Sequence, residues 1–169
     1  MTPTNPSPAR IAIRARNIYR PHGRAHWLRA AARAALAQTQ PRGACTWTIR
    51  LTDDDELHEL NRQFRGMDKP TDVLSFGGAG YRDGKPNAAY TPILDEGAEY
   101  LGDIIISLDR CTAQAAAGGH AVDTELALLV VHGTLHLLGY DHDTPSRKAR
   151  MWAAQSRALA ALGIELAVP

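Results

Sequence analysis

Three histidines in the last third of the chain constrain its fold more than any other feature. His132 and His136 lie four residues apart in an uncapped apolar run, so on a helix they project from one face, about 6 Å apart. Gly139 favours the left-handed backbone conformation that ends helices, and the turned chain brings His142 back toward the other two. The stretch 130–143 therefore predicts a helix and a turn on which three imidazoles converge.

Three neutral imidazoles that meet at one point suit a borderline metal ion, and zinc is the most plausible one. Zinc with three protein ligands keeps a fourth position for water, as catalytic sites do and structural sites do not. A lone histidine pair at this spacing is more often a hydrogen-bonded part of a core. Three buried and unpaired rings would instead cost several kcal/mol. We therefore predict one Zn²⁺ ion on His132, His136 and His142.

The same intervals occur in metzincin-type zinc helices, where a glutamate follows the first histidine and acts as the general base. Here that neighbour is Gly133. The metal ligands are present while the proton acceptor of a peptidase is missing, which indicates the same metal chemistry on a different substrate. Asp141 and Asp143 flank the third histidine. They either orient the ligands through hydrogen bonds or only stabilise the turn.

Length and composition limit the class of protein. The 169 residues fit one domain, and no apolar run reaches the ~18 residues of a membrane span. We expect residues 1–9 to form a disordered leader and residues 10–169 to form a single domain. Cys45 and Cys111 have no close partner and no metal-ligand spacing, so we expect two buried thiols and a cytoplasmic protein.

Charge is distributed unevenly along the chain. Residues 1–50 contain nine arginines and no acidic residue, a net charge of +9, whereas the remainder has ten basic and eighteen acidic residues, a net charge of −8. Arg14 and Arg16 would lie on the open face of a strand that begins near Ile11, a possible phosphate track. A polyanion-facing surface and a merely solvated arginine face are both compatible with this pattern.

Apolar periodicity predicts an α+β fold: a four-stranded mixed sheet packed with four or five helices, with the metal site at the end of a buried helix. Leu101–Leu108 is the most apolar strand and should lie centrally in the sheet. Leu57, Leu60 and Phe64 should face inward from a helix that begins near residue 53. The connection over 77–100 is far longer than usual, so we expect a lid or an insertion.

Two cations, Arg65 and Lys69, precede the strand that begins near residue 72, where a rigid turn would hold them over a pocket. For Arg65 the alternative is a structural ion pair with Asp68 or Asp72. Asp103, at the start of the most apolar strand, should place a carboxylate near one edge of the sheet.

Three blocks of sequence closely resemble the bacterial YbeY family of rRNA-maturation endoribonucleases. They are HGTLHLLGYDH at 132–142, LNRQFRGMDKPTDVLSF at 60–76 and LGDIIIS at 101–107, within a likeness that spans roughly 45–163. The resemblance implies zinc on the three histidines, a functionally important Arg65, and a single-strand-specific endoribonuclease for 16S rRNA 3′-end maturation and ribosome quality control. The implied partners are single-stranded RNA, 16S rRNA, and the small ribosomal subunit with its proteins, without DNA or a membrane.

Two positions depart from the usual letters of that family. Gly77 stands where a proline often follows LSF, and Gln155 replaces an acid that is common in the last helix. We expect neither residue to contact a proposed metal ligand, so that only the rim of the site would differ.

The leading hypothesis is metal-assisted phosphodiester cleavage. Zinc would activate water, Arg65 would be the catalytic group that meets the growing charge of the phosphate, and Lys69, Arg14 and Arg16 would bind substrate. The proton acceptor stays open between the metal-bound hydroxide itself, Asp103 and the RNA 2′-hydroxyl. The rivals are a metalloprotease, which the missing glutamate disfavours, and a non-catalytic ribosome-assembly factor whose zinc only stiffens the fold.

Overall fold

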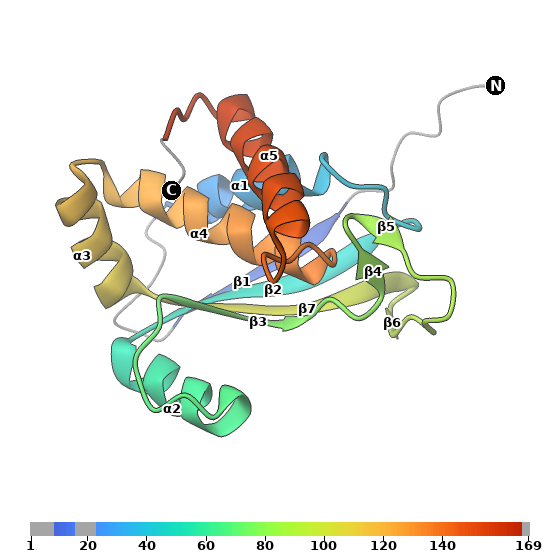
Figure 1. Cartoon of the computed structure of the whole chain (residues 1–169), viewed down its shortest axis with the longest axis horizontal. Helices are drawn as coiled ribbons and strands as arrows, with labels where there is room; N and C mark the ends of the chain where they lie inside the picture. Colours follow the sequence, from blue (N-terminus) through green and yellow to red (C-terminus); the bar gives the residue numbers. More distant parts are fainter. Residues whose placement is uncertain (1–8, 16–22, 167–169) are drawn as a thin grey trace.

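A computed structural model describes residues 9–15 and 23–166 of the chain (Figure 1). The elements, in chain order, are β1 (Arg10–Ala15), α1 (Ala25–Leu36), β2 (Cys45–Thr52), α2 (Asp54–Arg65), β3 (Val73–Gly77), β4 (Tyr81–Arg82), β5 (Lys85–Pro86), β6 (Leu94–Asp95), β7 (Ala98–Ser107), α3 (Leu108–Gly118), α4 (Val122–Leu137) and α5 (Pro145–Ala161). Residues 1–8 of the expected leader lie outside the described residues, so the leader and the single domain over 10–169 stay predictions.

The main sheet has the strand order β1-β2-β7-β3, and β6 pairs with the start of β7. β1, β2 and β7 are parallel to one another, whereas β3 and β6 run antiparallel to β7. This arrangement confirms the predicted α+β fold, the mixed sheet and the central place of the most apolar strand. The described chain has five helices. The sequence pattern did not locate α3, because a helix rich in alanine carries little amphipathic signal.

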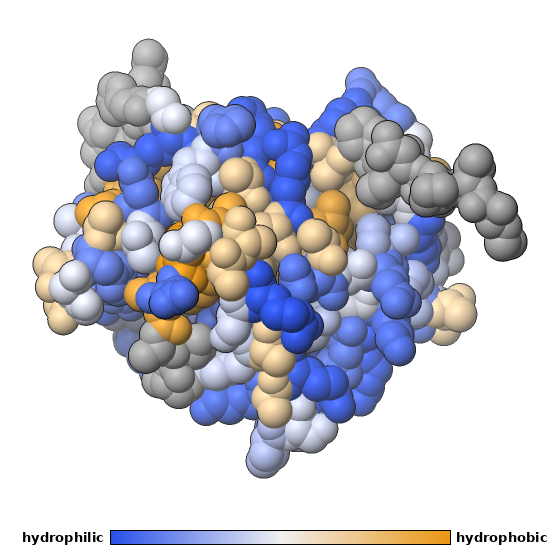
Figure 2. Space-filling model, turned by 90° about the horizontal axis from the view of Figure 1, so that it is seen from above, coloured by the Kyte–Doolittle hydropathy of each residue, from blue (hydrophilic) through white to orange (hydrophobic). Residues whose placement is uncertain are grey.

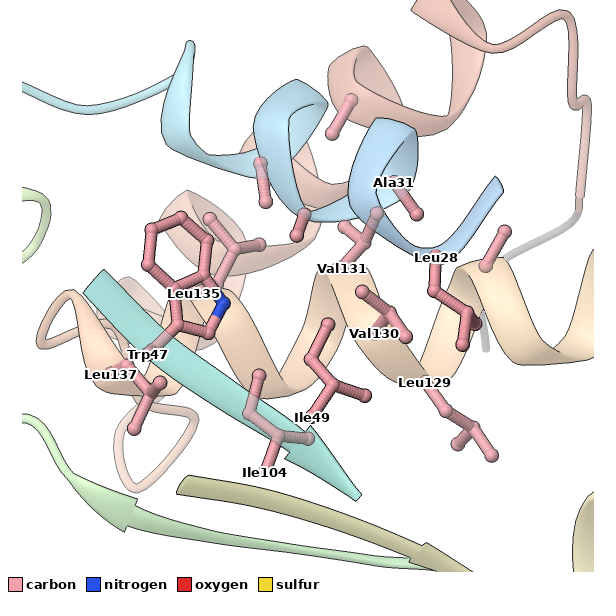
Figure 3. Close-up of a cluster of buried hydrophobic side chains, with 14 of the residues drawn as sticks. Leu28, Ala31, Trp47, Ile49, Ile104, Leu129, Val130, Val131, Leu135 and Leu137 are labelled. Atoms are coloured by element: carbon pink, nitrogen blue, oxygen red, sulfur yellow. The ribbon is translucent and has the colours of Figure 1, made fainter. Parts of the chain in front are cut away.

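Helices α1, α4 and α5 cover one face of the sheet, and α2 lies against the other (Figure 1). α4 is enclosed by α1, α3, α5 and the sheet, which explains why nearly every side of this helix is apolar. Side chains of the sheet reach toward α4 from below and those of α1 meet it from above; the fully buried ones in this layer include Leu28, Ala31, Trp47, Ile49, Ile104, Val130, Val131 and Leu135 (Figure 3). Seen from above, hydrophilic residues surround smaller apolar patches (Figure 2).

The α2 helix begins as its sequence predicts but turns one aromatic ring outward. The Asp53 carboxylate accepts a hydrogen bond from the Glu56 backbone N–H at 2.9 Å and so caps the helix. Leu57 is fully buried, whereas Phe64 is 65% exposed. The expectation that Phe64 faces inward is therefore wrong. Its ring lies edge-on to that of Phe76, at 5.3 Å between centroids.

The long connection over 77–100 contains the β4–β5 hairpin and the short strand β6. The hairpin holds the C-terminal end of α4: the Gly84 N–H donates to the Leu138 carbonyl at 2.9 Å, and the Asp83 N–H donates to the Gly139 carbonyl at 3.1 Å. This segment thus holds the turn between His136 and His142.

Gly139→Ala tests this attachment. At Gly139 φ is +79°, and a Cβ atom there would lie 2.2 Å from the Tyr81 carbonyl oxygen. Gly163 is a matched control, since its φ is +74° and nothing lies within 4 Å of its added Cβ. We expect Gly163→Ala to lower the free energy of unfolding by about 1–2 kcal/mol and Gly139→Ala to lower it by at least about 3 kcal/mol, in urea titrations. Equal losses would show that the hairpin does not constrain the turn.

Candidate active site

The structure brings the three predicted histidines together. One ligand atom from each of His132, His136 and His142 lies within 4.8 Å of the others. The Nε2 atoms of His132 and His136, both on α4, are 3.1 Å apart. The His142 ring approaches from the turn after α4, with its centroid 5.7 Å from that of His132 and 5.3 Å from that of His136. A helix spacing of four and the Gly139 turn thus produce the convergence that the sequence predicts.

Hydrogen bonds determine which ring nitrogens face the centre. His132 Nδ1 lies 3.0 Å from Gln155 Oε1, and His136 Nδ1 lies 3.0 Å from the Tyr140 carbonyl oxygen. Carbonyl oxygens only accept, so each Nδ1 carries the proton and each Nε2 keeps a lone pair. Two lone pairs facing each other at 3.1 Å repel unless a cation lies between or beside them. The donor set therefore fits a metal ion with imidazole ligands.

Burial keeps these rings in the form that binds metal. Desolvation is the main cause that lowers the pKa of His136 to about 4, and the neighbouring imidazoles lower it further. Desolvation likewise lowers the pKa of His132, against the opposing effect of its hydrogen bond to Gln155. Both imidazoles are neutral at neutral pH, as metal coordination requires.

Gly133 shows why no glutamate follows the first histidine. A Cβ atom at this position would lie 2.7 Å from Cγ2 of Ile104 on the central strand. The Ser75 hydroxyl also donates to the Gly133 carbonyl, at 3.2 Å. The residue next to His132 is therefore in close contact with the sheet, and a longer side chain has no room there.

A cleft of about 650 Å³ opens over the histidines. Its lining includes Ser75, Phe76 and Gly77 of β3, Phe64 and Arg65 at the end of α2, and Asp141 and Arg147 near the turn. Residues distant in the sequence thus enclose one space beside the imidazoles, and the space is large enough for part of an extended ligand.

Arg65 reaches this cleft without a partner among the described residues. Asp68 instead lies 2.7 Å from His58 Nε2, and Asp72 accepts hydrogen bonds from the Val73 N–H and the Gln114 amide. The alternative of a structural ion pair between Arg65 and Asp68 or Asp72 is therefore not formed. The guanidinium is available to an anion in the cleft.

Several other predicted residues lie elsewhere. Lys69 does not line the cleft. Arg14 is exposed on β1 and lines a separate cavity of about 420 Å³ together with Asp103 and Tyr100. This position removes Asp103 as a proton acceptor for chemistry at the histidines. Arg16 lies outside the described residues.

Four of the nine arginines in residues 1–50 form ion pairs within the described part of the fold. Ion pairs join Arg10 to Glu96 at 2.5 Å, Arg24 to Asp123 at 2.6 Å, Arg42 to Glu99 at 2.7 Å and Arg50 to Glu56 at 2.5 Å. These pairs join arginines of residues 1–50 to acidic residues of the remainder, so part of the charge asymmetry has a structural explanation.

Two residues of the last helix contact the histidines, and one of them does so against expectation. The expectation that Gln155 does not contact a proposed ligand is wrong, because its amide oxygen accepts the hydrogen bond from His132. Trp152 packs edge-on against His132 and His142, with ring centroids 6.0 and 5.6 Å away. The spacing of three between Trp152 and Gln155 is the signal that places both on one face of α5.

The two aspartates beside His142 belong to the turn. Asp141 accepts a hydrogen bond from the His142 backbone N–H at 2.8 Å, and Asp143 accepts from Arg147 at 2.9 Å. Arg147 also donates to the Gly139 carbonyl, at 3.0 Å. Among the described residues, neither carboxylate is hydrogen-bonded to an imidazole, so turn stabilisation is the role that the geometry favours.

Known proteins with similar sequences share this site-bearing region. The sequence model of the family described as "Endoribonuclease YbeY" matches residues 12–163. An endoribonuclease YbeY of Chloroflexus aurantiacus is 50% identical over 137 residues, which cover 80% of this chain and 84% of the relative. The chain belongs to the endoribonuclease YbeY family. A YbeY relative from Halalkalibacterium halodurans is 43% identical over 135 residues, covering 78% of this chain and 80% of the relative.

A solution structure of a protein from Thermotoga maritima supports the fold alone. It matches with a TM-score of 0.52 at 23% identity, over 90% of this chain and 91% of that chain. Membership in the YbeY family confirms the predicted family and the prediction of an endoribonuclease, and RNA is the implied substrate class. In the part of the chain that the structure describes, no helix combines the length and the hydrophobicity of a membrane span.

Gln155→Leu tests the hydrogen bond to His132. Leucine has a similar volume but cannot accept the Nδ1 proton, so His132 loses the contact that fixes its tautomer. We expect zinc affinity to fall by about 10–100-fold, measured by competition with a chromogenic chelator. Gln63→Leu, at an exposed position of α2, should leave the affinity unchanged. Wild-type affinity in Gln155→Leu would show that the hydrogen bond does not support the metal site.

Proposed function

We propose that this protein is a zinc-dependent, single-strand-specific endoribonuclease that acts in 16S rRNA 3′-end maturation and ribosome quality control in the cytoplasm. One observation carries the chemical part of the proposal: three imidazoles and Arg65, which has no ion-pair partner among the described residues, face one cleft. The sequence blocks shared with the YbeY family support the ribosomal part. We further propose a single domain over 10–169 and contacts with the small ribosomal subunit.

The three histidines would hold one Zn²⁺ ion, which lowers the pKa of a bound water and polarises a phosphoryl oxygen when present. Arg65 would bind the phosphate that is cleaved. Its guanidinium is planar and always charged, so that two of its N–H groups donate in parallel to phosphoryl oxygens. A charge held in place before the reaction stabilises the charge that develops on the phosphate.

The residues around the histidines limit the choice of proton acceptor. Gly133 has no side chain, and Asp103 lies in a different cavity. We therefore assign the proton of the attacking water to solvent in the cleft. The 2′-hydroxyl of the substrate would distinguish RNA from DNA as a hydrogen-bonding group, without taking up this proton.

The rim of the cleft supports a preference for single strands. Phe64 is 65% exposed, neighbours Arg65 in the sequence, and lies edge-on to Phe76, which also lines the cleft. An exposed ring beside a phosphate-binding arginine offers a surface on which an unpaired base stacks. Lys69, Arg14 and Arg16 are proposed to contact the RNA backbone beyond the cleft.

Cleavage assays with purified variants test the proposal. We expect the zinc-loaded wild type to cut single-stranded RNA, with a precursor of 16S rRNA cut near its 3′ end, and to leave a duplex of the same sequence intact. His136→Ala removes a metal ligand and Arg65→Ala removes the phosphate contact, so each should lower kcat/KM by at least about 100-fold. Arg62→Ala is the matched control, since Arg62 is on the same helix and pairs with Glu59 at 2.6 Å; it should keep wild-type activity.

Thermal unfolding of each variant establishes that the fold persists. Equal activity in the wild type, His136→Ala and Arg65→Ala would expose a contaminating nuclease. No cleavage by a zinc-loaded wild type would favour the non-catalytic assembly factor instead.

A further inference from the structure

A second cavity of about 300 Å³ lies beside the histidine cleft. The two cavities share His132, Asp72 and Val73 in their linings, so they are contiguous along α4. The cleft contains the charged groups that suit a phosphate. The second cavity lies toward the N-terminal end of α4, between that helix, α3 and α5. A ligand with its phosphate at the histidines thus has a place for its neighbouring group.

The exposed wall of this second cavity is mostly apolar, and polar side chains such as the His120–Glu125 pair line the rest. Leu128, Leu129 and Val73 supply aliphatic surface, and Trp152 supplies an aromatic ring that also lies edge-on to His132. A planar ring system gains most from such walls, because it buries both faces against aliphatic and aromatic groups. The volume is at the small end of ligand pockets, which suits one base and excludes a folded segment.

One glutamine in the lining has an unsatisfied amide atom. Gln114 donates from Nε2 to Asp72 at 3.1 Å, and its buried Oε1 has no hydrogen-bond partner among the described residues. Buried polar atoms are nearly always paired. An unused acceptor at the cavity therefore indicates a ligand that supplies a donor.

We propose that this cavity binds one unpaired nucleobase of the RNA substrate, from the nucleotide next to the phosphate at the histidines. The proposal rests on the proposed nuclease function and adds a base subsite to it. Every nucleobase carries both a donor and an acceptor on its Watson–Crick edge, and that edge is free only in unpaired RNA. A base that enters this cavity has left the stack, so the subsite selects single strands.

Binding measurements test the subsite by combining RNA hexamers that lack one base with protein variants whose cavity is filled. The protein carries His136→Ala so that it does not cut, and the probes are a labelled RNA hexamer and six versions that each lack one base. We expect one abasic position to weaken binding by at least about fivefold. Adding Leu128→Trp, which fills the cavity, should weaken binding of the intact hexamer, so that the intact and the abasic hexamer bind with the same affinity. The control Leu36→Trp, at a partly buried leucine of α1, should keep the difference in affinity between the two hexamers.

Gln114→Leu gives the same test without a change in bulk and serves if Leu128→Trp does not fold. It should reduce the penalty of the abasic position, because the acceptor for the base is gone. An unchanged penalty at every position in a folded Leu128→Trp or Gln114→Leu protein would overturn the subsite. If zinc-loaded wild type cuts RNA while the cavity substitutions leave the abasic penalty unchanged, only the subsite proposal fails. If these substitutions reduce the penalty but zinc-loaded wild type does not cut RNA, the subsite stands and the nuclease proposal fails.

Discussion

The lone pairs of His132 and His136 face each other at 3.1 Å because each ring donates its other nitrogen to a fixed carbonyl oxygen. In an apolar helix, this arrangement is costly without a bound cation. The surrounding structure nevertheless enforces it, through Gln155 from α5 and the Tyr140 carbonyl from the turn. The packed core thus holds two ring nitrogens with facing lone pairs close together. A bound metal ion would remove the repulsion between them. The site is in this sense preorganised for an ion.

Glycine positions make that geometry possible. Gly133 lets α4 lie directly on Ile104 of the sheet, and Gly139 lets the chain reverse against Tyr81 of the hairpin. The first contact fixes the height of the two histidines over the sheet, and the second fixes the path that returns His142 to them. Arg147 adds a hydrogen bond to the Gly139 carbonyl. The missing glutamate of related zinc helices is therefore a consequence of packing, and the phosphate-binding charge comes from Arg65 on a different element.

Features that depend on local pattern could be predicted from the sequence, and those that depend on distant contacts could not. The three histidines, the central strand and the Asp53 cap follow from spacing and residue type. α3 was missed because its alanines show no clear periodicity, and Phe64 was placed inward because the pattern does not reveal where the sheet ends. The pairing of the first arginines with acids such as Glu99, and the contact of Gln155 with His132, join residues far apart in the chain. No local signal carries those contacts, although the spacing of Trp152 and Gln155 marks their shared face.

X-ray absorption spectroscopy of the zinc-loaded protein tests the central claim most directly, since it reports the ligands of the ion without requiring activity. The account predicts three imidazole nitrogens at about 2.0–2.1 Å with one further light oxygen ligand and no sulfur, one ion per chain. Loss of one imidazole contribution in His142→Ala would agree with it. A sulfur ligand from Cys45 or Cys111, or a fourth protein ligand that closes the coordination sphere, would contradict it.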